Sequence, residues 1–256
     1  MTSLLGIAYS LVGAFLIVPP LVKRALVPID LPPERLEAGS PRHSERTLLR
    51  YRTVETTPRL FARWKLRLDP MFPRLAAFLK NPSHILDIGC GYGIPSVWLL
   101  ELFPAATVAC IDPDGERVRV AGRALGRQGE ARTGRAPGIG GLPAGADTAL
   151  ILDVIHMLDD GELRETLAIL RAKLVPGGRL VIRATIPEGG GRPWLRRIEE
   201  LRLKRHRLSP RYRSREVLEA MIRNAGFTVV AVEPAAPLSG ELWFVADRRA
   251  PGEGSP

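Results

Sequence analysis

One acidic residue and three alternating glycines have the types and the spacing that could bind and orient a small ligand. Asp87 is followed by Gly89, Gly91 and Gly93, and an apolar, helix-like run begins at Pro95. Glycine tolerates a positive φ and lets the main chain approach a ligand closely. The free N–H groups at the N-terminus of a helix attract a negative group. We therefore expect a strand, a tight turn and a buried helix that together hold an anionic part of a ligand.

A second acidic residue, Asp112, ends the apolar run 107–112 and lies 19 residues after Gly93. A carboxylate at the tip of such a strand can accept hydrogen bonds from both hydroxyl groups of a ribose. The glycine spacing does not match the dinucleotide fingerprint, because its last glycine would fall at position 94, which is Ile94. The spacing here is Asp-x-Gly-x-Gly-x-Gly instead.

Residues 86–93 have the sequence LDIGCGYG and resemble motif I of the class I S-adenosylmethionine-dependent methyltransferases. That ligand carries an amino acid in place of a pyrophosphate. The resemblance implies that the carboxylate of Asp87 meets the ammonium group, that loop N–H groups meet the carboxylate, and that Asp112 meets the ribose. The cofactor-binding residues predicted in this way are Asp87, Gly89, Cys90, Gly91, Gly93, Asp112, Pro113, Ala136 and Asp153.

The third strand departs from the family pattern. In the family this strand often ends in Gly-Asp-Ala, and the aspartate contacts the adenine amino group. The corresponding residues here are Gly134, Arg135 and Ala136. An arginine cannot accept a hydrogen bond from that amine. We therefore expect adenine to be held by the main chain at Ala136 and by stacking.

The fourth apolar run, residues 148–153, ends in Asp153 and is soon followed by His156, as after the fourth strand of small-molecule methyltransferases. Both side chains are expected at the ligand crevice. His156 is a candidate general base for a phenol or a carbon acid; a structural role near the cofactor is the alternative. Asp153 could orient His156 or contact the methionine part of the donor. The Asn/Asp-Pro-Pro-Tyr sequence of base and glutamine N-methyltransferases is absent, which disfavours a nucleic-acid amine as acceptor.

Further strands are expected over residues 179–185, 226–232 and 241–246, the last two as an antiparallel hairpin. The whole predicts an α/β fold, a Rossmann-like seven-stranded sheet with an antiparallel last strand, in a methyltransferase domain over residues 59–248. In the family, helices that precede motif I cover the cofactor and shape the acceptor pocket. Candidates for that pocket, with core packing as the alternative, are Tyr51, Trp64 and Phe72.

Residues 4–22 form an uncharged apolar run that as a helix would span about 28 Å, close to a bilayer core. Lys23 and Arg24 follow, so the positive-inside rule places the rest of the chain in the cytoplasm. The run resembles the last membrane helix of a lipid exporter of the MMPL type, which implies an association with a transporter. We expect one transmembrane helix at the inner (cytoplasmic) membrane, with a helix docked on the domain as the alternative, and a linker with short helical pieces over residues 23–58.

The 256-residue chain has a net charge of +10. Its two cysteines, Cys90 and Cys110, have no metal-type spacing, so we expect a reducing compartment, no disulfide framework and no metal site. Residues 192–215 are rich in arginine and predict a basic amphipathic helix. This insert could lie on anionic lipid, bind RNA phosphates or form a solvated lid. Residues 249–256 are expected to be a disordered tail.

These patterns predict an S-adenosylmethionine-dependent methyltransferase that modifies a small apolar, aromatic or lipid-linked acceptor at the cytoplasmic face of the membrane. One alternative is a non-catalytic methyltransferase-fold appendage of a membrane transporter. Another is an RNA methyltransferase that uses the arginine-rich insert. DNA is not an expected partner, and RNA is disfavoured because the insert contains no recognisable RNA-binding module.

Overall fold

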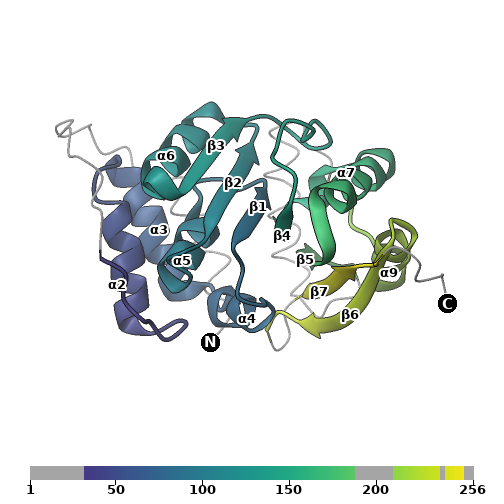
Figure 1. The fold of residues 1–256 in the computed structure, drawn as a ribbon, viewed down its shortest axis with the longest axis horizontal. Helices are drawn as coiled ribbons and strands as arrows, with labels where there is room; N and C mark the ends of the chain where they lie inside the picture. The colour runs from purple at the N-terminus through teal and green to yellow at the C-terminus, as the bar shows by residue number, and fades with distance from the viewer. Residues whose placement is uncertain (1–31, 188–209, 237–239, 251–256) are drawn as a thin grey trace.

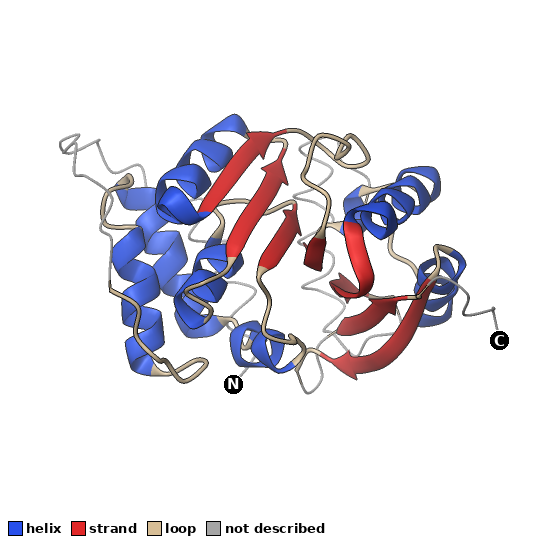
Figure 2. Cartoon of the chain, viewed as in Figure 1, coloured by secondary structure: helices blue, strands red, loops and turns tan. Residues whose placement is uncertain are grey.

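The computed structural model describes residues 32–187, 210–236 and 240–250, and its centre is a seven-stranded sheet with helices on both faces (Figures 1 and 2). The strand order is β3-β2-β1-β4-β5-β7-β6. β7 is antiparallel to β5 and β6, and the other pairs are parallel. This confirms the predicted sheet. The strands are β1 (His84–Ile88), β2 (Thr107–Asp112), β3 (Gly129–Thr133), β4 (Ala146–Leu152), β5 (Leu174–Thr185), β6 (Phe227–Pro234) and β7 (Glu241–Arg248).

The helices form two layers, each with its own hydrophobic core. Residues of α2 to α6 pack on one face of the sheet, and residues of α7 and α9 pack on the other. In Figure 1, α2, α3, α5 and α6 lie at the left, α4 lies at the bottom, and α7 and α9 lie at the right. The helices are α2 (Pro41–Arg50), α3 (Thr56–Leu68), α4 (Met71–Ala77), α5 (Ile94–Leu102), α6 (Gly115–Leu125), α7 (Asp160–Lys173) and α9 (Arg215–Asn224), with short 3₁₀ turns η1 (Gly126–Gln128) and η2 (Ile155–Met157).

The chain reverses its course across the sheet between β1 and β4. From β1 it passes outward to β2 and β3, and it then returns to pair β4 with the other side of β1. The connections that leave β1 and β4 therefore turn to opposite faces of the sheet. A crevice at the carboxyl ends of such strands is where open α/β sheets bind their ligands.

Residues 41–50 form a packed helix, although the sequence predicts a linker over residues 23–58. The side chain of Ser40 caps α2 by accepting a hydrogen bond from the N–H of His43 at 3.1 Å. Pro41 occupies the first turn, where its missing N–H is no loss. His43 and Thr47 are fully buried. The proline at 41 therefore begins a helix and does not mark a linker.

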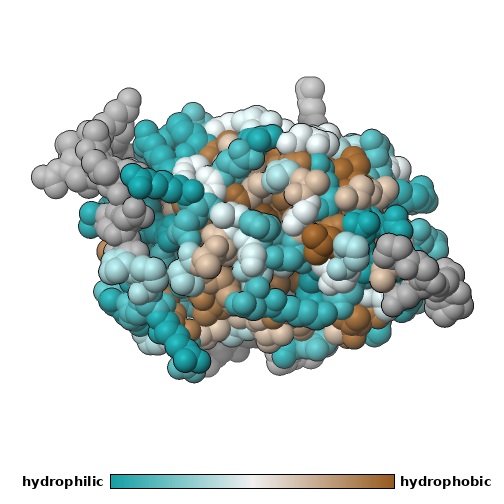
Figure 3. All heavy atoms as spheres, viewed as in Figure 1, coloured by the Kyte–Doolittle hydropathy of each residue, from teal (hydrophilic) through white to brown (hydrophobic). Residues whose placement is uncertain are grey.

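A buried ion-pair network ties α2 to α5. Glu101 of α5 is 3% exposed and accepts hydrogen bonds from Nε of Arg46 at 2.6 Å and Nε of Arg50 at 2.5 Å. A buried carboxylate is tolerated only when it is paired, so α2 belongs to the folded domain. The opposite, outer side of α2 is hydrophilic (Figure 3), and the side chains of Arg42 and Glu45 are 53% and 61% exposed.

Several sequence-based expectations concern residues outside the described ranges. These are the apolar run 4–22, residues 192–209 of the basic insert and residues 251–256 of the tail. Residues 210–214, at the end of the insert, are irregular and lead into α9. None of the helices in the described ranges combines the length and the apolar character that crossing a bilayer requires.

Candidate functional site

The glycine loop (residues 89–93) connects β1 to α5 at the carboxyl edge of the sheet. Gly89, Gly91 and Gly93 have φ angles of 77°, 55° and 73°, in the left-handed region that side chains disfavour. The N–H groups of Gly89 and Cys90 donate to the carbonyl oxygen of Ile111 in β2, at 2.8 and 3.1 Å. The predicted succession of strand, tight turn and helix is confirmed.

Two of these glycines lie where no side chain fits. A Cβ atom on Gly89 would lie 2.4 Å from Cγ2 of Val154, and one on Gly93 would lie 3.0 Å from Cβ of Ala121. A Cβ atom on Gly91 would meet nothing within 4 Å. Gly89 and Gly93 therefore allow close packing inside the protein. Gly91 lies on the open side of the loop, where a ligand can approach the main chain.

Gly89→Ala is expected to lower the free energy of unfolding by about 3 kcal/mol, because the new methyl group adds a clash with Val154 to the strain of a positive φ. Gly91→Ala is the matched control, with a positive φ and no clash, and about 1–2 kcal/mol is expected. Urea denaturation of both variants beside the wild type measures the two values. Equal losses would contradict the packing assigned to Gly89.

Asp112 lies at the tip of β2 and already anchors two loops. Its Oδ2 accepts a hydrogen bond from the N–H of Gly91 at 2.8 Å, and its Oδ1 accepts one from the N–H of Asp114 at 3.0 Å. A carboxylate oxygen can accept a second hydrogen bond, so both oxygens retain capacity for a diol. Asp114 caps α6 by accepting from the N–H groups of Glu116 and Arg117.

Asp87 lies in β1 and is 1% exposed. Its Oδ2 accepts a hydrogen bond from Oγ of Ser96, at 2.6 Å. Burial raises the pKa of Asp87 to about 6; the nearby Asp112 carboxylate adds to the rise and the Ser96 hydroxyl opposes it. An acid in this state gains most from a cationic partner, since a positive charge would favour its ionised form.

Cys90 and Cys110 are both buried beneath the glycine loop. Contact with Cys110, together with burial, raises the pKa of the Cys90 thiol. A thiol in this state is inert. Cys90 therefore contributes its main chain to the site and no thiolate.

The segment after β3 lies beside Asp112. The N–H of Gly134 donates to the carbonyl oxygen of Asp112 at 3.0 Å, Ala136 is buried, and Pro113 is exposed. The guanidinium of Arg135 donates to the carbonyl oxygen of Met157 at 3.2 Å and pairs with Glu162 at 3.1 Å. The arginine that replaces the family's acid thus points to the turn after β4.

Asp153 follows β4 with a φ of 61°, an unfavourable value for a residue with a side chain. Its Oδ1 lies 3.2 Å from Nε of Arg183, and its N–H donates to the carbonyl oxygen of Arg183 at 3.0 Å. The buried Arg183 also pairs with Asp69 and Glu241, each at 2.9 Å. The expectation that Asp153 orients His156 missed this partner. A buried arginine in the apolar strand β5 was the available signal.

His156 lies in η2 and its ring stacks on Tyr212, with centroids 5.9 Å apart and an angle of 23° between the planes. Its carbonyl oxygen accepts a hydrogen bond from the N–H of Arg211 at 2.8 Å. The buried Arg213 donates to the carbonyl oxygens of Ile155 and Leu158 at 3.0 and 2.7 Å. A segment some 55 residues downstream therefore holds the turn that carries His156, and sequence reasoning did not find it.

The three aromatic candidates for an acceptor pocket lie in different environments. Tyr51 is fully buried, and its Oη donates to the carbonyl oxygen of Tyr92 in the glycine loop. Phe72 packs in the core against Trp98, with ring centroids 5.4 Å apart. Trp64 is 43% exposed. Core packing therefore accounts for Phe72, and Tyr51 supports the loop.

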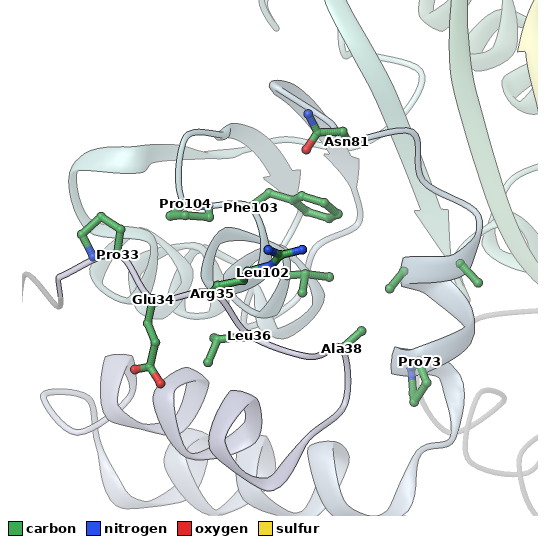
Figure 4. Close-up of a pocket in the computed structure, with 12 residues that line it drawn as sticks. Pro33, Glu34, Arg35, Leu36, Ala38, Pro73, Asn81, Leu102, Phe103 and Pro104 are labelled. Atoms are coloured by element: carbon green, nitrogen blue, oxygen red, sulfur yellow. The ribbon is translucent and has the colours of Figure 1, made fainter.

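A separate groove of about 800 Å³ lies away from the glycine loop (Figure 4). It is lined mainly by apolar residues from the segment before α2, from α4 and from the end of α5, among them Pro33, Leu36, Pro73, Leu102, Phe103 and Pro104. Asn81, which also lines it, precedes β1. The groove is therefore at the amino edge of the sheet, and the candidate site is at the carboxyl edge.

The sequence matches the family described as methyltransferase domain over residues 59–232. The chain belongs to this family.

Two curated proteins are similar to parts of the methyltransferase chain. It is 31% identical over 138 residues to ribosomal RNA small subunit methyltransferase C of Chromohalobacter salexigens, covering 51% of this chain and 41% of that protein. It is 34% identical over 104 residues to an uncharacterized protein of Synechococcus sp., covering 39% and 24%. The matched part thus spans less than half the length of either relative.

Solved structures of methyltransferases share the fold. Human N-acetylserotonin methyltransferase in complex with S-adenosylmethionine has a TM-score of 0.57 at 16% identity, covering 82% of this chain and 57% of that chain. The mitomycin 7-O-methyltransferase MmcR has a TM-score of 0.60 at 22% identity, covering 75% and 56%. An O-methyltransferase family protein of Burkholderia thailandensis has a TM-score of 0.59 at 19% identity, covering 77% and 60%. The seven-stranded sheet is that of the class I methyltransferases.

The residues of the site fit S-adenosylmethionine, the methyl donor used by this family. Asp87 offers a buried carboxylate to an ammonium group, and Asp112 retains acceptor capacity for a ribose diol. The open side of Gly91 leaves room for contact with the main chain. When bound, S-adenosylmethionine would supply a methyl group that is attached to a positively charged sulfur. Every other part of the chemistry depends on how the chain places the acceptor.

Proposed function

We propose that this protein transfers a methyl group from S-adenosylmethionine to a hydroxyl group of a small apolar or aromatic acceptor, free or lipid-linked. The observation that carries the proposal is that the glycine loop, Asp112 and the His156 turn lie at one edge of the sheet, where β1, β2 and β4 end. Two structural neighbours are named as O-methyltransferases, which supports an oxygen acceptor.

In this proposal the chain positions the reactants and moves one proton. Alignment in a dry crevice is the main requirement of a direct displacement. His156 accepts the proton of the acceptor hydroxyl as the new bond to carbon forms. The stacking of Tyr212 and the hydrogen bond from Arg211 keep the His156 turn in place.

Calorimetry with S-adenosylmethionine, followed by assays of methyl transfer to a panel of phenols and aliphatic alcohols, tests the proposal. Micromolar binding and methylation of at least one hydroxyl class are expected. A folded protein that does not bind the donor would overturn the proposal and favour the alternative, a non-catalytic appendage of a membrane transporter.

His156→Gln is expected to lower kcat about a hundredfold, because a positioned general base contributes on this scale. Donor affinity should stay within about threefold, since the donor is assigned to other residues. Steady-state kinetics at saturating donor, with calorimetry on the same variant, measures the two quantities. An unchanged kcat would leave His156 with a structural role only.

We further propose that residues 4–22 anchor the protein to the cytoplasmic membrane, near a transporter, with the methyltransferase domain in the cytoplasm. The uncharged run and the basic residues that follow it support this. Retention of the full-length chain in the membrane fraction after alkaline carbonate washing is the expected result. Release into the supernatant would overturn it.

RNA methylation is a second candidate, favoured by the 31% identity to a ribosomal RNA methyltransferase over half of this chain. The sequence after β4, residues 153–156, differs from the Asn/Asp-Pro-Pro-Tyr sequence of base methyltransferases. RNA binding that weakens steeply with salt would support this candidate. No affinity for ribosomal RNA at low salt would remove it.

A further inference from the structure

Tyr51 follows α2 directly and is fully buried, although it carries a hydroxyl group. The hydroxyl donates a hydrogen bond to the main-chain carbonyl oxygen of Tyr92, at 2.9 Å. Tyr92 lies between Gly91 and Gly93, which both have positive φ angles. A side chain from the N-terminal helices therefore holds the centre of the glycine loop.

The helix that carries Tyr51 is itself fixed to α5, the helix that follows the loop. The ring of His43 stacks on Trp98 at 4.2 Å, and its Nε2 lies 2.8 Å from the Trp98 carbonyl oxygen. Arg46 and Arg50 pair with the buried Glu101. The helix α2, which carries Tyr51 at its end, thus cannot shift against α5 without breaking buried polar contacts.

The peptide group between Tyr92 and Gly93 is held at both ends. Its carbonyl oxygen accepts from Tyr51, and its N–H donates to the carbonyl oxygen of Cys90 at 2.8 Å. Glycine has the greatest main-chain freedom of any residue, so a loop with three glycines needs such restraints to keep one shape. The Tyr51 hydroxyl supplies the restraint that comes from outside the loop.

The side chain of Tyr92 is held by the same layer of helices. Its ring meets Phe61 of α3 edge-on, with centroids 5.6 Å apart, and Cζ of Arg117 lies 5.8 Å from the ring centroid. The N-terminal helices therefore contact Tyr92 through both its main chain and its ring.

We propose that Tyr51 is a positioning residue for the methyl donor, acting by holding the glycine loop in its binding shape. This rests on the proposed function, because the loop is the donor site. When only a fraction of the protein molecules has the binding shape of the loop, the apparent affinity for the ligand is reduced by that fraction. Removing the hydroxyl frees the Tyr92 carbonyl and lets the loop sample other shapes, so donor affinity falls about tenfold.

Tyr51→Phe tests the proposal, with Thr47→Val as the matched control. Thr47 is one turn earlier on α2, is fully buried, and donates its hydroxyl to the carbonyl oxygen of His43 at 2.9 Å. Each variant therefore loses one buried hydroxyl from the same region. Calorimetry with S-adenosylmethionine should show about tenfold weaker binding for Tyr51→Phe and a change within twofold for Thr47→Val.

Amide hydrogen exchange on the donor-free protein gives an independent readout. Residues 91–93 should exchange faster in Tyr51→Phe, and the interior of α5 should be unchanged. Wild-type affinity and wild-type exchange in Tyr51→Phe, or equal losses of affinity in the two variants, would overturn the proposal. Absence of donor binding by the wild-type protein would overturn the proposed function itself, and the exchange data would still show whether Tyr51 holds the loop.

Discussion

Asp112→Ala is expected to weaken the binding of S-adenosylmethionine by about a thousandfold. The substitution removes the acceptor that we propose for the donor's ribose diol, and it removes the acceptor for the N–H groups of Gly91 and Asp114. Hydrogen bonds to a charged group contribute about 1.5–3 kcal/mol each, and two of them correspond to a factor of roughly 10² to 10⁴ in affinity. Calorimetry on the wild type and the variant measures the loss.

Asp114→Ala is the matched control for Asp112→Ala. It removes a neighbouring carboxylate that caps α6, which costs about 1 kcal/mol of stability. It leaves both oxygens of Asp112 available to the donor, so affinity should change by no more than about threefold. If Asp112→Ala also stayed within threefold, the ribose site would have to lie elsewhere.

Asp87→Asn is expected to raise the free energy of unfolding and to weaken the binding of S-adenosylmethionine. Burial of the charged carboxylate raises its pKa to about 6 from an ordinary value of 3.8. This difference corresponds to about 3 kcal/mol of stability lost at neutral pH. The amide retains an oxygen that can accept from Ser96. Donor affinity should fall about a hundredfold, because the substitution removes the anionic partner that we propose for the ammonium group.

The direction of the pKa shift of Asp87 determines how the stability of the wild-type protein changes with pH. The folded-state pKa of Asp87 is higher than the unfolded-state value, so the folded protein binds the proton more tightly. Wild-type stability therefore decreases as pH rises from about 4 to 6 and is constant, in this respect, above that range. Urea denaturation from pH 4 to pH 7.5 should show the advantage of Asp87→Asn opening across the same interval.

Ser96→Ala provides the control for this titration. The Ser96 hydroxyl lowers the pKa of Asp87, so its removal should shift the interval to higher pH. A difference between wild type and Asp87→Asn that does not vary with pH would show that burial of the charge is not the cause.

The sheet and the turn geometry of the glycine loop were predictable because their signals are local. Most of the strands, among them β1, β2 and β4, are short apolar runs, and residues 86–93 carry their turn geometry in the spacing of the glycines. Asp112 was found because it ends such a run. The cap at Asp114 follows from its place before a helix. In each case neighbours in the sequence determine the conformation.

The supports of the site were not predictable, because they join residues far apart in the sequence. Arg183 meets Asp69 across 114 positions, and Tyr51 meets Tyr92 across 41. No local pattern indicates which charges will pair. The place of α2 in the packed domain was missed for a different reason: the prolines of residues 23–58 suggested a linker with short helical pieces, although Ser40 followed by Pro41 is a helix start. That pattern was the available signal.

The pairing of Glu101 with Arg46 and Arg50 determines which segment of this chain could be moved into another protein as an intact folding unit. Similarity to the family begins at residue 59, after both arginines. A fragment from that point would keep all seven strands and the glycine loop, but it would lose both partners of Glu101 and the stacking of His43 on Trp98. The face of α5 that packs on α2 would then be uncovered, and the restraint of Tyr51 on the glycine loop would be lost with it. The unit that recombination or protein engineering could move intact therefore begins no later than Ser40, ahead of the boundary that sequence similarity marks.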